Sequence, residues 1–382
     1  MQVITNTEAL KEFSQQLKGK PFVTVDTEFM REKTYWPILC LIQAAADGVE
    51  AIIDPMAEGI DLSPFLDVMA DKNIVKVFHA ARQDLEIFYK LMGEVPAPLF
   101  DSQIAAMACG FGDQVGYEPL MRKLVGAKID KGSRFTDWAR RPLAETQLTY
   151  ALSDVTYLRE AYGLLVDRLN KDERMSWVEE ETASLYEPSL YFVKPEDAWK
   201  RLKLRGIRTS DLGPMIALAE WREREAQSRD IPRGRVIKDE AIYELARMRP
   251  TTPKELGRAR SISAGFERSK TGAALIDAIN IGKNLASDQL PKISRNENRD
   301  PPPADVVELL KVLLKQQCEK LSVAPKLIAS ASDLEDIALN DNADVRALRG
   351  WRKEVFGDLA LQLKRGEIAL KLSGNSVEII KF

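Results

Sequence analysis

Short apolar runs alternate with amphipathic stretches along the first part of the chain. This pattern predicts strands at residues 21–29, 38–46, 49–55, 74–80 and 99–101. Between them it predicts helices at residues 62–71, 82–93 and 102–110. Strands interleaved with helices are typical of an α/β domain. Because only the Asp47-Gly48 turn separates two of the strands, we expect a hairpin there and a mixed sheet.

The strand pattern ends near Pro188, and helical periodicity replaces it. Residues 142–190 repeat apolar side chains at roughly 3.6-residue spacing, and residues 196–382 are predicted to form helices joined by polar turns. The polar, proline-rich stretch at 296–303 is the clearest domain boundary. The helical stretches on its two sides resemble each other weakly, which we interpret as an internal duplication of about 80 residues per copy.

Length and composition place the chain among ordinary globular proteins of more than one domain. It has 382 residues, of which 45% are hydrophobic and 30% charged, and it contains no apolar run long enough to span a membrane. The N-terminal residues lack the basic and apolar regions of a secretory signal. The three cysteines are scattered, which favours reduced thiols in the cytoplasm over a disulfide framework or a zinc site.

The net charge of −3 gives no global sign of nucleic-acid binding, but the charge is unevenly distributed. Residues 208–283 contain 15 Lys and Arg against 11 Asp and Glu, residues 304–382 contain 12 of each, and the N-terminal part is therefore acidic. An acidic part followed by a basic module suits a metal-binding catalytic unit with a polyanion-binding appendage. Solvated helix faces would give the same charge counts.

Two carboxylates emerge together at the end of a predicted core strand. Asp26 and Glu28 are two positions apart, so they point to the same face of that strand. Like charges on one face repel each other unless a cation holds them, and carboxylate oxygens suit Mg²⁺ or Mn²⁺. Taken alone, a pair of this kind is more often simply solvated.

Two further acidic elements follow along the chain. Asp84 falls in the first turn of the helix predicted after the strand at 74–80, where the helix dipole alone would favour an acid. Tyr150 and Asp154 are four positions apart and share one face of a later helix, so the phenol could orient a water beside a metal-bound carboxylate. A surface Tyr–Asp pair would have the same spacing.

Missing residues exclude other kinds of chemistry. The single histidine, His79, excludes a two-histidine ribonuclease mechanism and leaves a Ser-His-Asp triad only one possible base. No Gly-x-x-x-x-Gly-Lys-Ser/Thr loop is present, so the chain is not a P-loop ATPase or helicase.

Taken in order, the acidic elements resemble the DEDD exonuclease superfamily in its tyrosine subclass. The histidine subclass would place a His at the position of Thr149. Further motifs resemble the bacterial ribonuclease D family: Phe29, Lys33 to Pro37, Leu41 to Gln43, Asp101 to Gln103, Arg134, Thr136 to Trp138 and Arg141 to Leu143. This resemblance is strong over about residues 1–200. The two helical stretches are similar to helicase-and-RNase-D C-terminal (HRDC) domains, the first clearly and the second loosely.

The resemblance implies a domain organisation. We expect an α/β ribonuclease H-like exonuclease domain with a helical extension at residues 1–200, built as a mixed sheet flanked by helices. Two all-α HRDC-like domains are expected to follow at residues 205–286 and 304–382, joined by a linker at 287–303.

It also implies a mechanism, namely a 3′→5′ exoribonuclease that uses two Mg²⁺ or Mn²⁺ ions and releases 5′-nucleoside monophosphates. Asp26 would bridge both metals, and Glu28 and Asp154 would complete the first metal site. Asp84 would hold the second metal through water, and Tyr150 would position the attacking water.

A further set of residues is expected to contact the RNA: Phe29, His79, Gln83, Arg134 and Trp138. Phe29 could stack on a terminal base, although ordinary core packing would explain it equally well. The first HRDC-like domain is expected to add an auxiliary RNA-binding surface made of Arg233, Arg235, Lys238, Arg247, Arg249, Lys254, Arg258 and Arg260.

The resemblance favours a cytoplasmic monomer that trims the 3′ ends of tRNA precursors. Two alternatives stay open at this point. One is a 3′→5′ DNA exonuclease of the same superfamily, because the sequence cannot locate a contact to the 2′-OH. The other is a non-catalytic RNA-binding scaffold, although a scaffold has no need to keep four mutually repelling acids together.

Overall fold

The structure is a computed structural model that describes residues 2–130, 132, 136–204, 206–286, 288, 290–291 and 301–382. The chain divides into two compact units. The first contains residues 1–28, 41–187 and 298–382, and the second contains residues 29–40 and 188–297. None of the helices in the described ranges carries a stretch long and apolar enough to span a bilayer.

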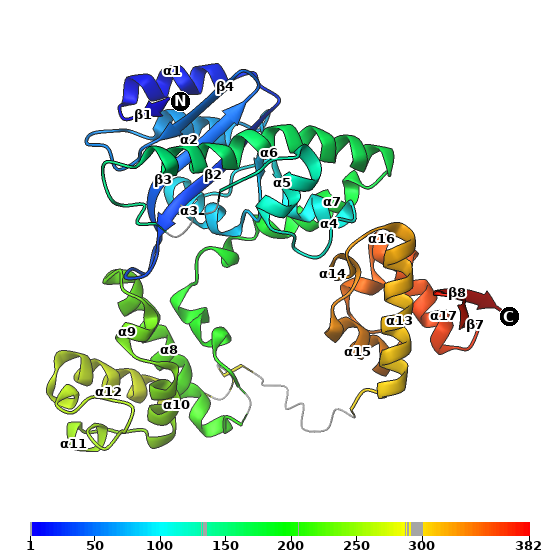
Figure 1. The fold of residues 1–382 in the computed structure, drawn as a ribbon. Helices are drawn as coiled ribbons and strands as arrows, with labels where there is room; N and C mark the ends of the chain where they lie inside the picture. Colours follow the sequence, from blue (N-terminus) through cyan, green and yellow to red (C-terminus); the bar gives the residue numbers. More distant parts are fainter. Residues whose placement is uncertain are drawn as a thin grey trace. The chain divides into compact units, whose positions relative to one another are not determined.

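A six-stranded mixed sheet forms the centre of the first unit (Figure 1). The strands lie in the order β1-β4-β3-β2-β5-β6. Their bounds are β1 Val3–Ile4, β2 Phe22–Met30, β3 Ile38–Ala46, β4 Val49–Ile53, β5 Val75–Phe78 and β6 Leu99–Asp101. β2, β5 and β6 run parallel to one another, whereas β3 and β4 form the predicted antiparallel hairpin, with Ala46 opposite Val49. The predicted mixed sheet is therefore confirmed.

Helices surround this sheet. Their bounds are α1 Thr7–Leu17, α2 Ser63–Ala70, α3 Arg82–Met92, α4 Ser102–Ala108, α5 Tyr117–Val125, α6 Glu145–Lys171 and α7 Met175–Ala183. The long helix α6 crosses the strands in Figure 1. Its apolar positions, among them Leu158, Leu165 and Leu169, are buried at about 3.6-residue spacing.

A hydroxyl fixes α6 against the centre of the sheet. Thr24 lies in the buried part of β2, and its Oγ1 lies 2.9 Å from the carbonyl oxygen of Val155 in α6. The same hydroxyl lies 3.0 Å from the carbonyl oxygen of Ala45 in β3. Because buried polar groups need partners, this contact sets the register of α6 on β2. The residues next to Val155 are consequently held close to the end of β2.

The C-terminal module of the first unit contains a β-hairpin that the sequence analysis did not predict. Its helices are α13 Ala304–Leu321, α14 Pro325–Ile328, α15 Ala331–Leu339, α16 Gly350–Arg352 and α17 Asp358–Lys364, the last two joined by a short π-helical segment. Strands β7 (Ile368–Ser373) and β8 (Ser376–Lys381) then pair antiparallel. The expectation of helices alone after residue 196 is therefore wrong. Alternating apolar positions on both sides of the turn at Gly374 carried the strand signal.

This module packs on helix α7 within the first unit. The rings of Trp177 and Trp351 stack with centroids 4.0 Å apart. Arg352 is buried and pairs with both Glu180 and Glu181. The guanidinium also donates to the carbonyl oxygen of Leu327, at 2.9 Å. Helix α7 and the C-terminal module thus share a charge-paired contact around the buried Arg352.

In the described part of the second unit, the regular structure outside residues 29–40 is helical. Its helices are α8 Thr209–Ser228, α9 Arg233–Val236, α10 Asp239–Met248, α11 Pro253–Leu256 and α12 Lys270–Lys283. α8 and α12 approach so closely that a Cβ on Gly282 would lie 2.5 Å from the carbonyl oxygen of Gly213. In both α8–α9–α10 and α13–α14–α15, a long helix is followed by a one-turn helix and then by a helix of intermediate length. This common order is in keeping with the interpretation as a duplication. The predicted boundaries stay predictions, and much of the linker at 287–303 lies outside the described residues.

We expect Arg352→Met to destabilise the first unit by about 2 kcal/mol, because it removes a buried guanidinium that pairs with the half-buried Glu181 and donates to the carbonyl oxygen of Leu327. Urea unfolding of the full chain measures this loss. Arg349→Met is the matched control: Arg349 pairs with Asp344 at an exposed position, where we expect a loss of about 0.5 kcal/mol or less. Equal losses in the two variants would contradict the prediction.

Candidate active site

Strand β2 delivers the first two carboxylates. Val23 and Val25 are fully buried, so the strand is fixed in the core up to the point where the acids begin. Asp26 and Glu28 alternate with the buried Thr27 and lie on one face of the strand, as the spacing predicted. Both acids are half-buried, which places their charges at the margin of the core.

Helix α6 adds the third carboxylate. Asp154 precedes Val155, the residue that is fixed against Thr24 of β2, and its side chain is buried. One carboxylate oxygen from each of Asp26, Glu28 and Asp154 lies within 4.8 Å of the others. Three oxygens this close form a ligand set for a hard divalent cation. One strand and one helix thus bring Asp154 next to Asp26 and Glu28, from which it is at least 126 positions away in the sequence.

Asp84 is the fourth carboxylate, and it is held beside the same strand. It lies in the first turn of α3 and is buried. Thr27 Oγ1 donates a hydrogen bond of 2.5 Å to Asp84 Oδ1. Because Thr27 lies between Asp26 and Glu28, this bond fixes the start of α3 to the acidic end of β2. The predicted position of Asp84 in the first helical turn is confirmed.

The turn that leads into α3 depends on a further acid. Ala80 has a φ of 58°, in the left-handed region that alanine rarely adopts. The backbone amides of Ala80 and Ala81 donate to the two carboxylate oxygens of Asp101, at 3.0 and 2.9 Å. Asp101 also caps α4 by accepting from Gln103 N at 2.8 Å. One side chain at the end of β6 therefore shapes the turn that presents Asp84.

Without a bound cation, repulsion among the carboxylates of the site opposes folding. Burial, and then repulsion from Asp154, raise the pKa of Asp26 well above its usual range. Burial, and then repulsion from Asp26, raise the pKa of Asp84 in the same direction. A bound divalent ion would relieve both penalties, since it replaces carboxylate repulsion by attraction.

Tyr150 lies one helical turn before Asp154 on α6, as predicted, and it is half-buried. Its ring centroid is 6.2 Å from that of Trp138, whose side chain is only 3% exposed. The loop that carries Trp138 is clamped by Arg141, which donates to both oxygens of Asp54 at 2.7 Å and to the carbonyl oxygen of Trp138 at 2.7 Å. Trp138 thus supports Tyr150 from within the core.

The remaining residues predicted to contact RNA differ in their exposure and in their contacts. His79 Nδ1 lies 2.9 Å from Ser102 Oγ, and burial lowers the pKa of the imidazole, which favours its neutral form. Gln83 is exposed on the first turn of α3. Phe29 is half-buried in β2, directly after Glu28. Arg134 lies outside the described residues.

Sequence reasoning missed the residues that hold the acids in place. Tyr117 lies close enough to Asp154 and Asp26 that both charges, after burial, raise the pKa of its phenol. Its hydroxyl donates to the carbonyl oxygen of Ser153 at 2.8 Å, beside Asp154. Thr27 went unnoticed because a threonine in a core strand gives no signal of the hydrogen bond that it makes across the fold.

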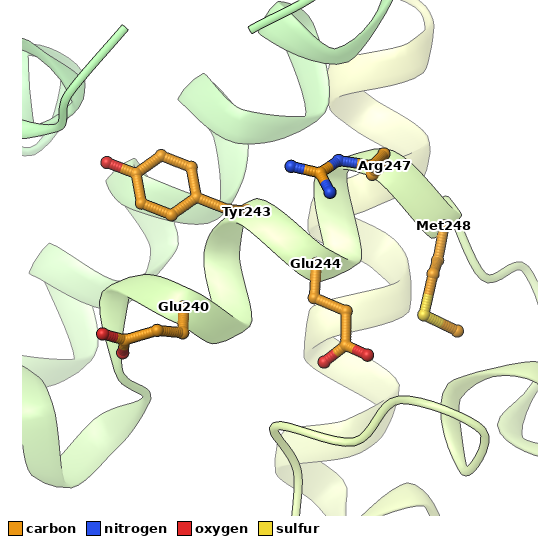
Figure 2. Close-up of a pocket in the computed structure, with 5 residues that line it drawn as sticks. All are labelled: Glu240, Tyr243, Glu244, Arg247 and Met248. Carbon is orange, nitrogen blue, oxygen red and sulfur yellow. The ribbon is translucent and has the colours of Figure 1, made fainter. Parts of the chain in front are cut away.

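The basic residues predicted to form an RNA-binding surface are partly engaged in ion pairs. Arg233 pairs with Glu223, and Arg249 pairs with Asp211. Arg247 lines a hollow of about 460 Å³ on α10 with Tyr243, Met248 and two acids, Glu240 and Glu244, as Figure 2 shows. Because the lining contains both signs of charge, this hollow is not a uniformly basic surface.

Comparison with known families agrees with this geometry. The family described as 3′-5′ exonuclease matches residues 1–170, and the HRDC domain family matches residues 215–279. Ribonuclease D of Acidiphilium cryptum is 49% identical over 378 residues, which cover 99% of this chain and 96% of that protein. The chain belongs to the ribonuclease D family. It is therefore a 3′→5′ exoribonuclease, a hydrolase, as the resemblance implied.

Other members of the ribonuclease D family extend the likeness. Ribonuclease D of Nitrobacter hamburgensis is 48% identical over 377 residues, covering 99% of this chain and 98% of that protein. The crystal structure of Escherichia coli RNase D, described as an exoribonuclease involved in structured RNA processing, has a TM-score of 0.82 and 30% identity. It covers 96% of this chain and 98% of the Escherichia coli chain. The predicted fold class, a ribonuclease H-like exonuclease domain followed by helical HRDC structure, is confirmed.

The raised pKa values predict how stability depends on pH in the absence of metal. An acid whose pKa is raised on folding favours the folded state below its ordinary value of 3.8, and this contribution is lost as the pH rises through the raised pKa. We therefore expect the chain in EDTA to lose stability above about pH 4. Asp26→Asn, which removes one half-buried charge from the cluster, should raise the stability at pH 7 by on the order of 1 kcal/mol.

Thermal unfolding in EDTA, followed by circular dichroism across this pH range, measures the effect. The matched control is Asp67→Asn on α2, because Asp67 is exposed and should leave the pH profile unchanged. An Asp26→Asn chain that is no more stable than the wild type at pH 7 would contradict the electrostatic account of the site.

Proposed function

We propose that the chain removes nucleotides from the 3′ ends of structured RNA, tRNA precursors in particular, by hydrolysis that depends on two divalent metal ions. The observation that carries this proposal is the cluster of Asp26, Glu28 and Asp154, whose oxygens lie within 4.8 Å of one another beside a buried fourth acid. The substrate class rests on the similarity to Escherichia coli RNase D, an exoribonuclease involved in structured RNA processing, and the choice of tRNA rests on the family resemblance.

The donor set fits Mg²⁺ or Mn²⁺. All of its atoms are carboxylate oxygens, which hard divalent cations prefer. The raised pKa of Asp26 and of Asp84 marks a site whose negative charges are under-compensated in the absence of a cation. When bound, two such ions stabilise the attacking and the leaving oxygen of an in-line displacement at phosphorus.

The side chains of the chain itself have separate roles in this proposal. Asp26, Glu28 and Asp154 would hold metal with their carboxylate oxygens, and Asp84, fixed by Thr27, would contribute to a second metal position beside Asp26. Tyr150 would position the attacking water. The released product is a 5′-nucleoside monophosphate.

Contacts to the RNA are proposed for residues at the edge of this site. Gln83 is exposed on the helix that carries Asp84, and Phe29 directly follows Glu28, so both are candidates for the terminal nucleotide. His79, Arg134 and Trp138 complete the proposed set. The burial of Trp138 favours a supporting role, with its ring packed toward Tyr150.

The proposal extends to the compartment, the oligomeric state and the domain boundaries. We propose a cytoplasmic monomer, and the three buried cysteines, which form no disulfide, suit a reducing compartment. The proposed domains are an exonuclease domain at 1–200 and HRDC-like domains at 205–286 and 304–382, joined by the linker at 287–303. The family match at 215–279 supports the second of these three domains.

Degradation of a 5′-labelled single-stranded RNA and of the matching DNA, each with Mg²⁺, Mn²⁺ or EDTA, tests the proposal. We expect a ladder that shortens from the 3′ end on RNA, and no cleavage in EDTA. A tRNA precursor with a 3′ extension should be trimmed to a defined end. Equal rates on DNA would contradict the proposed restriction to RNA, and RNA binding without cleavage would indicate a scaffold.

Substitutions in the cluster should separate metal binding from orientation of the water. Asp26→Asn and Asp154→Asn should each lower the cleavage rate on the order of 1,000-fold or more, since each removes a metal-binding charge. Tyr150→Phe should lower the rate about 100-fold and leave metal affinity unchanged. Single-turnover cleavage and calorimetric Mn²⁺ titration measure these effects.

Matched controls exist for both kinds of substitution. Tyr157→Phe removes a phenol hydroxyl from the same helix α6, and Asp67→Asn neutralises an exposed acid on α2. Both should cleave at the wild-type rate. A folded Asp26→Asn chain that cleaves as fast as the wild type would show that the site is misassigned.

A further inference from the structure

The segment at residues 29–40 belongs to the helical unit, although it lies between two strands of the exonuclease sheet. It begins directly after Glu28, within β2, and ends within β3. The rest of this unit is formed by residues 188–297, nearly 150 positions further along the chain. A piece of chain continuous with the metal-binding strand is therefore packed as part of the HRDC-containing unit.

Tyr35 is the centre of this packing. Its side chain is only 6% exposed and lies in an apolar cluster with Ala226 and Val236. The phenol hydroxyl donates to Glu223 Oε1 and accepts from Arg233 Nη2 at 2.7 Å and from Gln227 Nε2 at 3.1 Å. The hydroxyl thus uses both its donor and its acceptor capacity on residues of α8 and α9.

A buried ion pair surrounds the hydroxyl. Glu223 is 1% exposed, and Arg233 donates to both of its carboxylate oxygens. The guanidinium carbon of Arg233 also lies 4.6 Å from the centroid of the Tyr35 ring. Burial alone would raise the pKa of Glu223, but hydrogen bonds from Arg233 and Tyr35 outweigh it and lower the pKa, so the carboxylate is charged at neutral pH.

The backbone of the segment is fixed as well. The amides of Tyr35 and Trp36 both donate to Asp230 Oδ1, each at 3.0 Å. The rings of Trp36 and Phe192 lie parallel with centroids 6.2 Å apart. Side-chain and backbone contacts together fix Tyr35 and Trp36 within the helical unit.

We propose that Tyr35, Glu223 and Arg233 are positioning residues for the exonuclease reaction: by fixing the segment at 29–40, they fix the end of strand β2 that carries Asp26 and Glu28. This role rests on the proposed function of the two acids. It differs from the expected role of the basic module as an RNA-binding appendage, which would act on substrate affinity alone.

Chain geometry supports this coupling. β2 is continuous from Phe22 to Met30, so only Arg31 to Thr34 separate its end from Tyr35. The four linking residues lie outside the strand, so a shift of Tyr35 reaches Glu28 through only a short stretch of backbone. Misplacing a reacting group by about 1 Å typically costs on the order of 100-fold in rate. Loosening the segment should therefore lower the rate of the chemical step.

The test uses the full chain with Glu223→Gln, which removes the buried charge, and Tyr35→Phe, which removes only the hydroxyl. Glu220→Gln is the matched control, because Glu220 lies on the same helix α8 and pairs with Arg224 at the surface. Each variant is assayed in single-turnover cleavage on an RNA of about 4 nucleotides and on one of about 20. RNA affinity is measured separately in Ca²⁺.

We expect Glu223→Gln and Tyr35→Phe to lower the cleavage rate about 10-fold to 100-fold on both RNAs, with RNA affinity changed less than about 3-fold. Glu220→Gln should match the wild type. A loss confined to the longer RNA and explained by weaker affinity would overturn the proposal in favour of an RNA-binding appendage, and unchanged rates in both variants would overturn it outright.

Unfolding is separated from mispositioning by the milder variant. Tyr35→Phe keeps the ring, its packing and its contact with Arg233, so circular dichroism should report a folded chain. If the proposed function is wrong, the wild-type chain itself will cleave neither RNA, and this outcome is distinct from a loss of rate in the variants alone.

Discussion

Mutual repulsion among closely spaced carboxylates is the constraint on which the rest of the structure depends. Asp26, Glu28 and Asp154 place oxygens within 4.8 Å of one another, and Asp84 is buried beside them. Such a cluster opposes folding in the absence of a cation, as the raised pKa values of Asp26 and Asp84 indicate. The fold must therefore hold these groups together by contacts made elsewhere, and divalent metal binding then gains from relief of the repulsion.

Those contacts come from residues without catalytic chemistry of their own. Thr24 ties helix α6, and with it Asp154, to the strand that carries Asp26. Thr27 and Asp101 fix Asp84 through a hydrogen bond and a left-handed turn. Packing in the helical unit holds Tyr35, in the segment that follows Glu28 and the end of β2.

The sequence was informative where the signal is local and periodic. Alternation in β2 predicted that Asp26 and Glu28 share a face, and the Asp-Gly turn predicted the β3–β4 hairpin. Contacts such as Tyr35 to Glu223 join residues 188 positions apart and leave no periodic trace, so they could not be predicted. The C-terminal hairpin was missed because its two short strands follow a long helical stretch that set the expectation.

Anomalous scattering from Mn²⁺ tests the central claim most directly. A crystal of the chain grown with Mn²⁺ and an RNA carrying a non-hydrolysable 3′-terminal linkage would locate every bound ion. The account predicts two peaks, one coordinated by Asp26, Glu28 and Asp154 and a second between Asp26 and Asp84. Strong Mn²⁺ peaks elsewhere on the chain, with none at these carboxylates, would contradict it.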